Sequence, residues 1–254
     1  MRIAVAGGTG VAGRYVVLAA EEAGHEVVSL SRAGGVDVRT GDGLTGALDG
    51  VDVVVDALNT GTRNRAKATA FFVETTRNLQ SAASATGVRH LVLLSIVGVD
   101  RVPGFPYYEA KVAQEVAVQQ GPVAVSIVRA TQFHEFAGQL LDGLAKGPFA
   151  PIPSMRIRPV AARTVGRRLV EVAVSGSDSG SGGTHSDLAG PDEIALTDMA
   201  RLTVRRRGNH LLVVPVRLPG AAGRALRGGA LLPGPAAVVA GPGPHEWLDS
   251  ADVR

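Results

Sequence analysis

The sequence predicts an α/β fold, a doubly wound parallel sheet with a small C-terminal lobe on the substrate side. Three observations point to this fold. Short valine-rich apolar runs alternate with helical patterns in the first half of the chain, a glycine-rich segment directly follows the first run, and single glycines stand where helices should end. We therefore expect one domain over residues 1–130, and a lobe over residues 131–254 that is partly integrated with the sheet.

The first domain is expected to contain five buried strands separated by helices. Because both faces of a parallel sheet are covered, its strands are continuous apolar runs. The predicted strands cover residues 2–6, 27–30, 51–55, 91–94 and 123–128. The predicted helices cover residues 11–23, 64–86 and 108–120, with C-terminal caps at Gly24, Gly87 and Gly121. A short run at residues 36–38 predicts one more strand, and the alternation predicts right-handed crossovers.

The lobe has a less regular pattern than the first domain. Prolines interrupt the chain between residues 148 and 159, and residues 175–186 are rich in glycine and serine, which predicts a mobile loop. Beyond this loop, the predicted elements are a strand at 188–190, a helix at 198–207, a strand at 211–216 and a last helix at 245–251.

The composition excludes several classes of protein. None of the 254 residues is cysteine, which excludes disulfides and thiolate sites, and the six histidines are too scattered to predict a metal site. The net charge is only +3 and the arginine clusters lack interleaved aromatic residues, so we expect no nucleic-acid partner. No apolar run approaches the roughly 20 residues of a membrane-spanning helix. The first apolar stretch stops at a glycine turn, unlike a signal peptide. We expect no membrane partner and a cytoplasmic location.

The glycine-rich segment at residues 7–13 predicts a dinucleotide site. It fits two overlapping templates, GxGxxG from Gly8 and GxxGxxG from Gly7. Both need a tight turn, a bare backbone that a pyrophosphate can approach, and close packing of helix on strand. The alternative is a purely structural turn, but a strand precedes the segment and a helix follows it. The expected cofactor contacts are Gly7, Thr9, Gly10, Val11 and Gly13.

The residues after the second strand indicate which dinucleotide is preferred. An NAD-preferring site usually carries Asp or Glu there, whereas this chain has Ser31 and Arg32. Because arginine can pair with a 2′-phosphate, we expect NADP(H), with NAD(H) as the alternative. Arg32 could also be an ordinary loop arginine. From position alone, Asp42 is expected to bind the adenine amino group and Asn59 to line the nicotinamide ribose.

Three polar residues at and after the predicted strand at residues 91–94 suggest catalysis. Ser95 ends that strand, at the sheet edge where open α/β folds bind ligands. Tyr107 and Lys111 are four residues apart and share one helix face. A nearby ammonium would lower the pKa of the phenol by stabilising the phenolate. Tyr107 could then protonate a carbonyl oxygen that Ser95 holds.

These residues resemble the short-chain dehydrogenase/reductase superfamily, in particular its atypical NmrA-like branch. The resemblance covers residues 1 to 130 through the glycine segment, Ser95, Tyr107 and Lys111. It implies an NADP-bound Rossmann fold with Ser95 as oxyanion partner, Tyr107 as acid/base and Lys111 on the ribose hydroxyls. Residues 129–136 resemble the segment that covers the nicotinamide and substrate. The expected substrate contacts are Gln132, Phe133 and His134, although packing or capping is an equal alternative for His134.

One departure from the family pattern leaves the function open. Phe72 aligns with the asparagine that completes the proton relay of extended family members, and a phenyl ring cannot relay a proton. The leading hypothesis is an NADPH-dependent reductase of a small carbonyl or quinone-like acceptor. The alternatives are a regulatory protein that senses NADP(H) without turnover and a structural subunit with a vestigial pocket. A homodimer through the long helices is common among relatives, and nothing in the sequence tests it.

Overall fold

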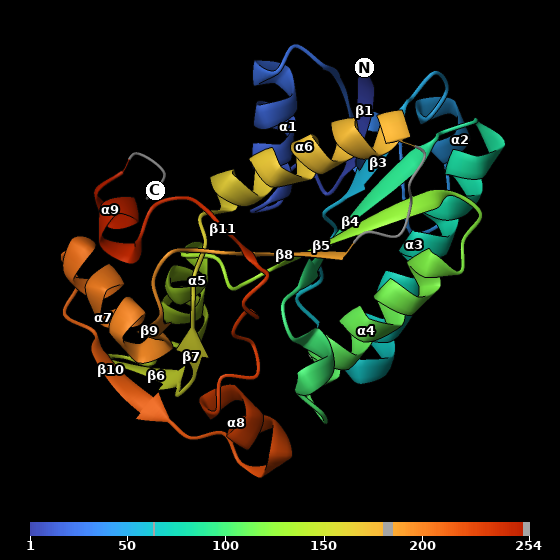
Figure 1. Cartoon of the computed structure of the whole chain (residues 1–254). Coiled ribbons are helices and arrows are strands. Elements are labelled where there is room, and N and C mark those ends of the chain that lie inside the picture. The colour runs from blue at the N-terminus through green and yellow to red at the C-terminus, as the bar shows by residue number, and fades with distance from the viewer. Residues whose placement is uncertain (63, 180–184, 251–254) are drawn as a thin grey trace. The chain divides into compact units, whose positions relative to one another are not determined.

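The computed structural model describes residues 1–62, 64–179 and 185–250, with the backbone alone for 177–179 (Figure 1). The chain forms two compact units. Unit 1 comprises Met1–Ser95, Pro106–Arg129 and Val165–Ser186, and unit 2 comprises Ile96–Phe105, Ala130–Thr164 and Asp187–Arg254. The chain passes from unit 1 to unit 2 between Arg129 and Ala130 and returns to unit 1 at Val165, so neither unit is one continuous stretch of sequence.

Strands and helices alternate through the first part of the chain (Figure 1). The strands are β1 (Arg2–Ala6), β2 (Glu26–Leu30), β3 (Val53–Asp56), β4 (His90–Ile96), β5 (Ala124–Ala130), β6 (Phe149–Pro153), β7 (Arg156–Ile157), β8 (His185–Ala189), β9 (Ile194–Ala195), β10 (Leu212–Val216) and β11 (Val238–Val239). The helices are α1 (Gly13–Glu22), α2 (Leu44–Ala47), α3 (Arg65–Ala85), α4 (Pro106–Gln119), α5 (Glu135–Leu144), α6 (Ala162–Ser179), α7 (Leu196–Arg206), α8 (Gly220–Arg227) and α9 (Pro244–Asp249), with single 3-10 turns η1 (Arg32–Gly34) and η2 (Val99–Arg101).

The main sheet has the strand order β11-β8-β5-β4-β3-β1-β2, which confirms the predicted doubly wound parallel sheet. Ala4 of β1 lies opposite Val28 of β2 on one side and opposite Val54 of β3 on the other. The strand order therefore reverses at β1. Ligands of open α/β sheets bind beyond the carboxyl ends of the strands at such a reversal. The ends of β1 and β3 mark the candidate site.

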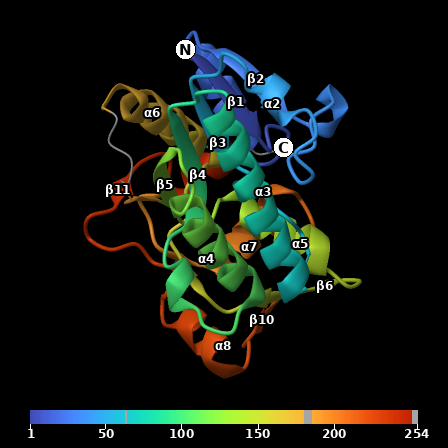
Figure 2. The ribbon, with the colours of Figure 1, turned by 90° about the vertical axis from the view of Figure 1, so that its right-hand side faces the viewer.

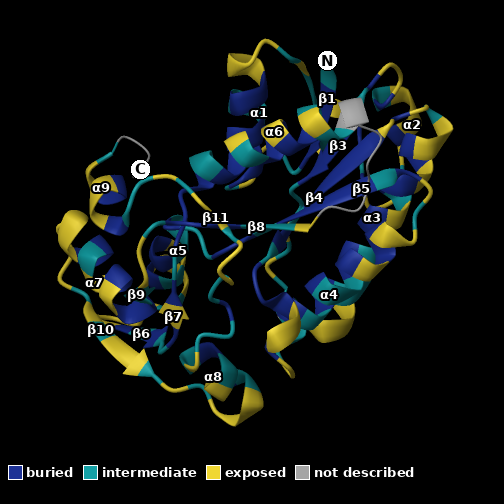
Figure 3. Ribbon diagram, viewed as in Figure 1, coloured by how far each residue is buried: buried dark blue, intermediate teal, exposed yellow. Residues whose placement is uncertain are grey.

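Helices cover both faces of the sheet in unit 1. On one face, Leu44 of α2, Leu79 of α3 and Val118 of α4 pack in a single core with β1, β4 and β5. Helices α1 and α6 lie on the opposite face (Figure 1), and Figure 2 shows α6 and α3 on opposite sides of the strands. Buried residues run along β1, β3 and β4 (Figure 3). Burial on both faces explains why these strands are continuous apolar runs in the sequence.

Two sequence predictions about unit 1 are wrong. Residues 36–38 form no strand, because the chain turns back at once and Asp37 only makes an isolated bridge with Asp42. Glycines with positive φ at positions 35, 41 and 43 allow this tight turn. Helix α6 was not predicted, and its last turn takes up residues 175–179 of the expected loop. The following residues, 180–184, lie outside the described part of the chain.

The predicted glycine caps have different physical roles. Gly24 and Gly87 follow α1 and α3 with φ of 76°, the left-handed conformation expected of a helix cap. Gly121, in contrast, does not have a positive φ. A Cβ at Gly121 would instead collide with the buried side chain of Gln80, so this glycine makes room for a side chain.

In unit 2, β6 pairs with β10 in parallel, and β7 pairs with β9 antiparallel. The predicted strand at 211–216 and helix at 198–207 correspond to β10 and α7, and β8 ends within the predicted strand at 188–190. The last predicted helix corresponds to α9, while its final residue, Ala251, falls beyond the described part. Within the described residues, no helix is both long and apolar enough for a membrane crossing.

Candidate functional site

The glycine-rich segment forms the turn from β1 into α1. Gly7 has φ of 81°, and a Cβ there would lie 2.8 Å from the carbonyl oxygen of Ala57. A Cβ at Gly13 would collide with the carbonyl oxygen of Gly7, so glycine is required where the helix crosses the turn. Thr9 and Gly10 are exposed at the tip. No side chain caps α1, which leaves its N-terminus available to a phosphate.

The segment after β2 carries the residues expected at the adenine end. Ser31 starts the turn η1, and its Oγ accepts a hydrogen bond of 3.3 Å from the backbone N–H of Gly34. Arg32 is exposed, and its guanidinium has no recorded partner among the described residues. This side chain can therefore pair with an anion without breaking an existing contact.

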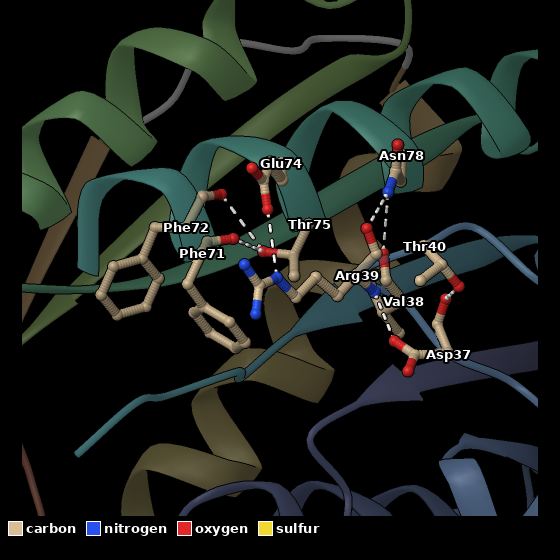
Figure 4. A network of polar contacts seen from close by, with 9 residues as sticks. All are labelled: Asp37, Val38, Arg39, Thr40, Phe71, Phe72, Glu74, Thr75 and Asn78. Atoms are coloured by element: carbon tan, nitrogen blue, oxygen red, sulfur yellow. Dashed lines mark hydrogen bonds and ion pairs between the residues drawn. The ribbon is translucent and has the colours of Figure 1, made fainter. Parts of the chain in front are cut away.

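Asp42 lies in a turn that is tied to helix α3. Its Oδ2 accepts a hydrogen bond of 2.8 Å from the Thr40 hydroxyl. The Nδ2 of Asn78 donates to the carbonyl oxygens of Val38 and Arg39, at 3.1 and 2.7 Å. Arg39 also pairs with Glu74 of α3 at 3.1 Å (Figure 4). The exposed carboxylate of Asp42 thus stands on a turn that α3 holds in place.

Tyr107 and Asn59 are brought together from α4 and the segment after β3. The Tyr107 hydroxyl donates a hydrogen bond of 3.0 Å to Asn59 Oδ1. Burial raises the pKa of Tyr107 to about 12. The expected lowering by Lys111 is therefore not present here, because the ammonium of that lysine points to other partners. Tyr107 is held in its protonated form.

Lys111 is buried at the end of β4 and makes two hydrogen bonds. Its Nζ donates to the carbonyl oxygen of Leu94 at 2.8 Å and to Gln114 Oε1 at 2.5 Å. It also lies 4.9 Å from the ring centre of Phe72. Burial lowers the pKa of Lys111 to about 8, and nearby Asp56 and Glu115 partly oppose this effect.

Gln114 connects Lys111 to a buried carboxylate. Its Nε2 donates a hydrogen bond of 3.0 Å to Asp56 Oδ2, and Asp56 Oδ1 accepts one of 3.0 Å from the backbone N–H of Leu58. Burial raises the pKa of Asp56, against the effects of these hydrogen bonds and of Lys111. Neither Gln114 nor Asp56 was predicted from the sequence as a site residue. The available signal was that Gln114 follows Lys111 by three residues on the same helix face.

Ser95 stands beside this cluster at the end of β4. Only 2% of the residue is exposed, and its Oγ has no hydrogen-bond partner among the described residues. Buried hydroxyl groups are nearly always bonded, so the Ser95 hydroxyl can accept or donate a bond to a water or a ligand without breaking an existing one. Unit 1 thus contributes Ser95, Asn59, Tyr107 and Lys111 from neighbouring elements.

The three residues expected to contact substrate lie in unit 2. His134 is completely buried and stacks on Trp247 with ring centres 5.0 Å apart. Its Nε2 lies 3.1 Å from the carbonyl oxygen of Pro242, so this nitrogen donates the hydrogen bond. These contacts agree with the packing alternative for His134. Gln132 and Phe133 are half-buried, and their contact with substrate stays a prediction.

The described residues contain no cluster of acidic and histidine side chains that could hold a metal ion. The polar groups around Lys111 are amide, hydroxyl and phenol groups with the carboxylates of Asp56 and Glu115. Such a set suits an organic ligand with hydroxyl groups better than it suits a divalent cation.

Sequence comparison identifies relatives of this chain. A model of the NAD(P)H-binding family matches residues 7–140, more than half of the sequence. The chain is also similar to the photosystem II assembly factor Ycf39 of Synechocystis sp. The two are 27% identical over 238 residues, which cover 85% of this chain and 71% of that protein.

Structure comparison finds the same fold in several enzymes and related proteins. MoeE5 in complex with UDP-glucuronic acid and NAD matches with a TM-score of 0.74 and 16% identity, covering 98% of this chain and 96% of that one. A short-chain dehydrogenase/reductase superfamily protein from Agrobacterium tumefaciens with bound NAD matches with a TM-score of 0.63 and 22% identity, covering 90% and 92%. Identities this low establish the fold, and function has to be argued from the site.

Proposed function

Because this chain belongs to the NAD(P)H-binding family, with the short-chain dehydrogenase/reductase fold, we propose that it is an NADPH-dependent reductase of a small carbonyl or quinone-like acceptor. One observation carries the proposal. The end of β4 presents a buried, unbonded hydroxyl of Ser95 next to Leu94, whose carbonyl holds the Lys111 ammonium. An unpaired hydroxyl donor beside a fixed ammonium can stabilise a substrate oxygen that gains negative charge during the reaction.

The residues present fit an NADP(H) cofactor. The uncapped N-terminus of α1 would receive the pyrophosphate, and Arg32 would pair with the 2′-phosphate. Asp42 would accept a hydrogen bond from the adenine amino group. Asn59 and Lys111 would bind the nicotinamide ribose, because Asn59 follows β3 and the Lys111 ammonium bonds to the Leu94 carbonyl of β4.

The proposed chemistry divides between the cofactor and two side chains. When bound, the reduced nicotinamide supplies a hydride for the acceptor carbon. Ser95 would hold the acceptor oxygen by donating a hydrogen bond, and Tyr107 would give that oxygen its proton. The raised pKa of Tyr107 keeps the phenol protonated at neutral pH, as an acid requires.

The second candidate function is nucleotide sensing without turnover. It is favoured by Phe72, which is fully buried and lies against the Lys111 ammonium. A phenyl ring has no group that can donate or accept a proton, so Phe72 cannot serve in a proton relay with Lys111. The similarity to a photosystem II assembly factor agrees with a role through a protein partner. A cytoplasmic location and a homodimer belong to either proposal.

Fluorescence titration tests the cofactor assignment. The purified protein is titrated with NADPH and NADH separately, and again after Arg32→Ala. We expect NADPH to bind more tightly and to lose about tenfold in affinity in this variant, while NADH binding is unchanged. Arg77→Ala, which removes an exposed arginine from α3, is the matched control. Equal loss for both nucleotides would contradict the assignment.

Turnover then separates the two candidate functions. NADPH oxidation is followed with a panel of small carbonyls and quinones, using Tyr107→Phe as the control for acid catalysis. Oxidation that falls at least 100-fold in this variant supports the reductase. Tight NADPH binding without oxidation by any acceptor would favour the sensor.

A further inference from the structure

A continuous chain of buried polar contacts extends from Lys111 through Gln114 to Asp56. The exposed fractions of these residues are 3%, 0% and 1%. Gln114 and Lys111 come from α4, whereas Asp56 is the last residue of β3. The proposed reaction uses only Lys111, so the other two need a separate explanation.

The orientation of the Gln114 amide is fixed by its two neighbours. An ammonium group has only donors, and an ionised carboxylate has only acceptors. The amide must therefore turn its oxygen to Lys111 and its nitrogen to Asp56, as observed at 2.5 and 3.0 Å. The reverse orientation would place an amide N–H against the ammonium. The order of donors and acceptors runs in one direction, from Lys111 to the carboxylate.

The two ends of this chain carry opposite charges that burial alone would suppress. A lone buried charge loses several kcal/mol of solvation and tends to become neutral. The other charged group facing Lys111 is Glu115 on α4, whose carboxylate is already paired with Arg129 at 2.6 Å. From α3, the ring of Phe72 lies 4.9 Å from the ammonium and carries no charge. Asp56 is therefore the carboxylate that balances Lys111.

We propose that Asp56 and Gln114 are positioning residues for Lys111, which hold its ammonium at the carboxyl end of β4 and keep it charged there. The inference rests on the proposed function only where it assigns the ribose hydroxyls to Lys111. The Leu94 carbonyl and Gln114 take two of the three ammonium donors, which leaves one for a ligand. The three positions thus act as one unit.

The titration of Lys111 itself provides a direct test that needs no cofactor. The chain has only three lysines, so protein labelled with ¹³C at lysine Cε gives three signals, assigned with Lys67→Arg and Lys146→Arg. In the unchanged protein, we expect Lys111 to titrate near pH 8. Asp56→Asn and Gln114→Leu should each lower that midpoint by about one pH unit or more.

Gln80→Leu is the matched control for removal of a buried amide. Gln80 is also almost fully buried, but its side chain bonds only to backbone atoms of Val118 and Val123. We expect this variant to leave the Lys111 midpoint unchanged. An unchanged midpoint in both Asp56→Asn and Gln114→Leu would overturn the proposal, as would an equal shift in Gln80→Leu. If Asp56→Asn does not fold, Gln114→Leu decides alone.

NADPH affinity measured over the same pH range separates this inference from the proposed function. We expect binding to weaken above the Lys111 midpoint, and to weaken at correspondingly lower pH in Asp56→Asn and Gln114→Leu. A shifted midpoint with no NADPH binding at any pH would support the positioning role and refute the proposed function. NADPH binding with an unshifted Lys111 midpoint would support the proposed function and refute the positioning role.

Discussion

Replacing His134 should change how the stability of the protein depends on pH. Burial lowers the pKa of His134 to about 4, from 6.5 in an unfolded chain. The unfolded state therefore binds more protons than the folded state between these two values. Protonation of His134 in the unfolded state therefore lowers the free energy of unfolding progressively as the pH falls from 6.5 to 4. Above pH 6.5 this effect is absent. The full difference is about 3 kcal/mol, at roughly 1.4 kcal/mol per pKa unit.

The structure explains why protonation is unfavourable at this position. The Nε2 of His134 donates to Pro242, and its Nδ1 is buried without a hydrogen-bond partner in the described part of the chain. A proton added to Nδ1 would be buried without a hydrogen-bond acceptor among the described residues. Asp192 offers only partial electrostatic compensation.

Urea unfolding at pH 7 and pH 5 measures this effect. Trp247 is the only tryptophan in the chain and stacks on His134, so its fluorescence follows the relevant region. When the pH falls from 7 to 5, the unchanged protein should lose about 2 kcal/mol of unfolding free energy relative to His134→Gln. His210→Gln, at an exposed position, should show no such change. A pH-independent difference for His134→Gln would refute the reasoning.

Two further changes test the site in unit 1. Gly13→Ala should abolish NADPH binding and lower the free energy of unfolding by about 2 kcal/mol or more, because the added Cβ collides with the Gly7 carbonyl oxygen. Gly46→Ala, where the added Cβ has open space, should do neither. Nucleotide titration and urea unfolding measure the two effects. Ser95→Ala should leave the unfolding free energy within about 1 kcal/mol, because its hydroxyl makes no recorded bond to lose, while kcat falls about 100-fold. Loss of stability with unchanged kcat would show that Ser95 is structural.

The sheet of unit 1 was predictable because burial on both faces leaves a simple signal. The valines of β3 are buried, and two of the glycines after β1 stand where a Cβ would collide with the backbone. Residues 36–38 also form an apolar run, but the glycines around them favour a turn. Helix α6 was missed because Gly166 and the serines at its end obscured the apolar spacing of Val165, Leu169 and Val172.

The candidate site was predictable only in part, for a similar reason. A spacing of four residues identifies Tyr107 and Lys111, because both lie on one helix. Asp56 and Gln114 are 58 positions apart in the sequence, and the fold brings them together where α4 lies against the end of β3. The sequence also could not show that Lys111 bonds to Gln114, so the expected effect on the pKa of Tyr107 was wrong for this structure.

The return of the chain to unit 1 at Val165 affects the order in which the protein can fold during synthesis. Helix α6 covers one face of the sheet with Val165, Leu169 and Ala173, all of them buried. A nascent chain that has reached residue 130 has made β1 to β5 and α1, but still exposes the part of that face that α6 covers. It must stay in this state until about 50 more residues have emerged, some seconds at ordinary rates of translation. A gene fragment that ends at residue 130 would produce the same incomplete sheet permanently, and we expect it to aggregate.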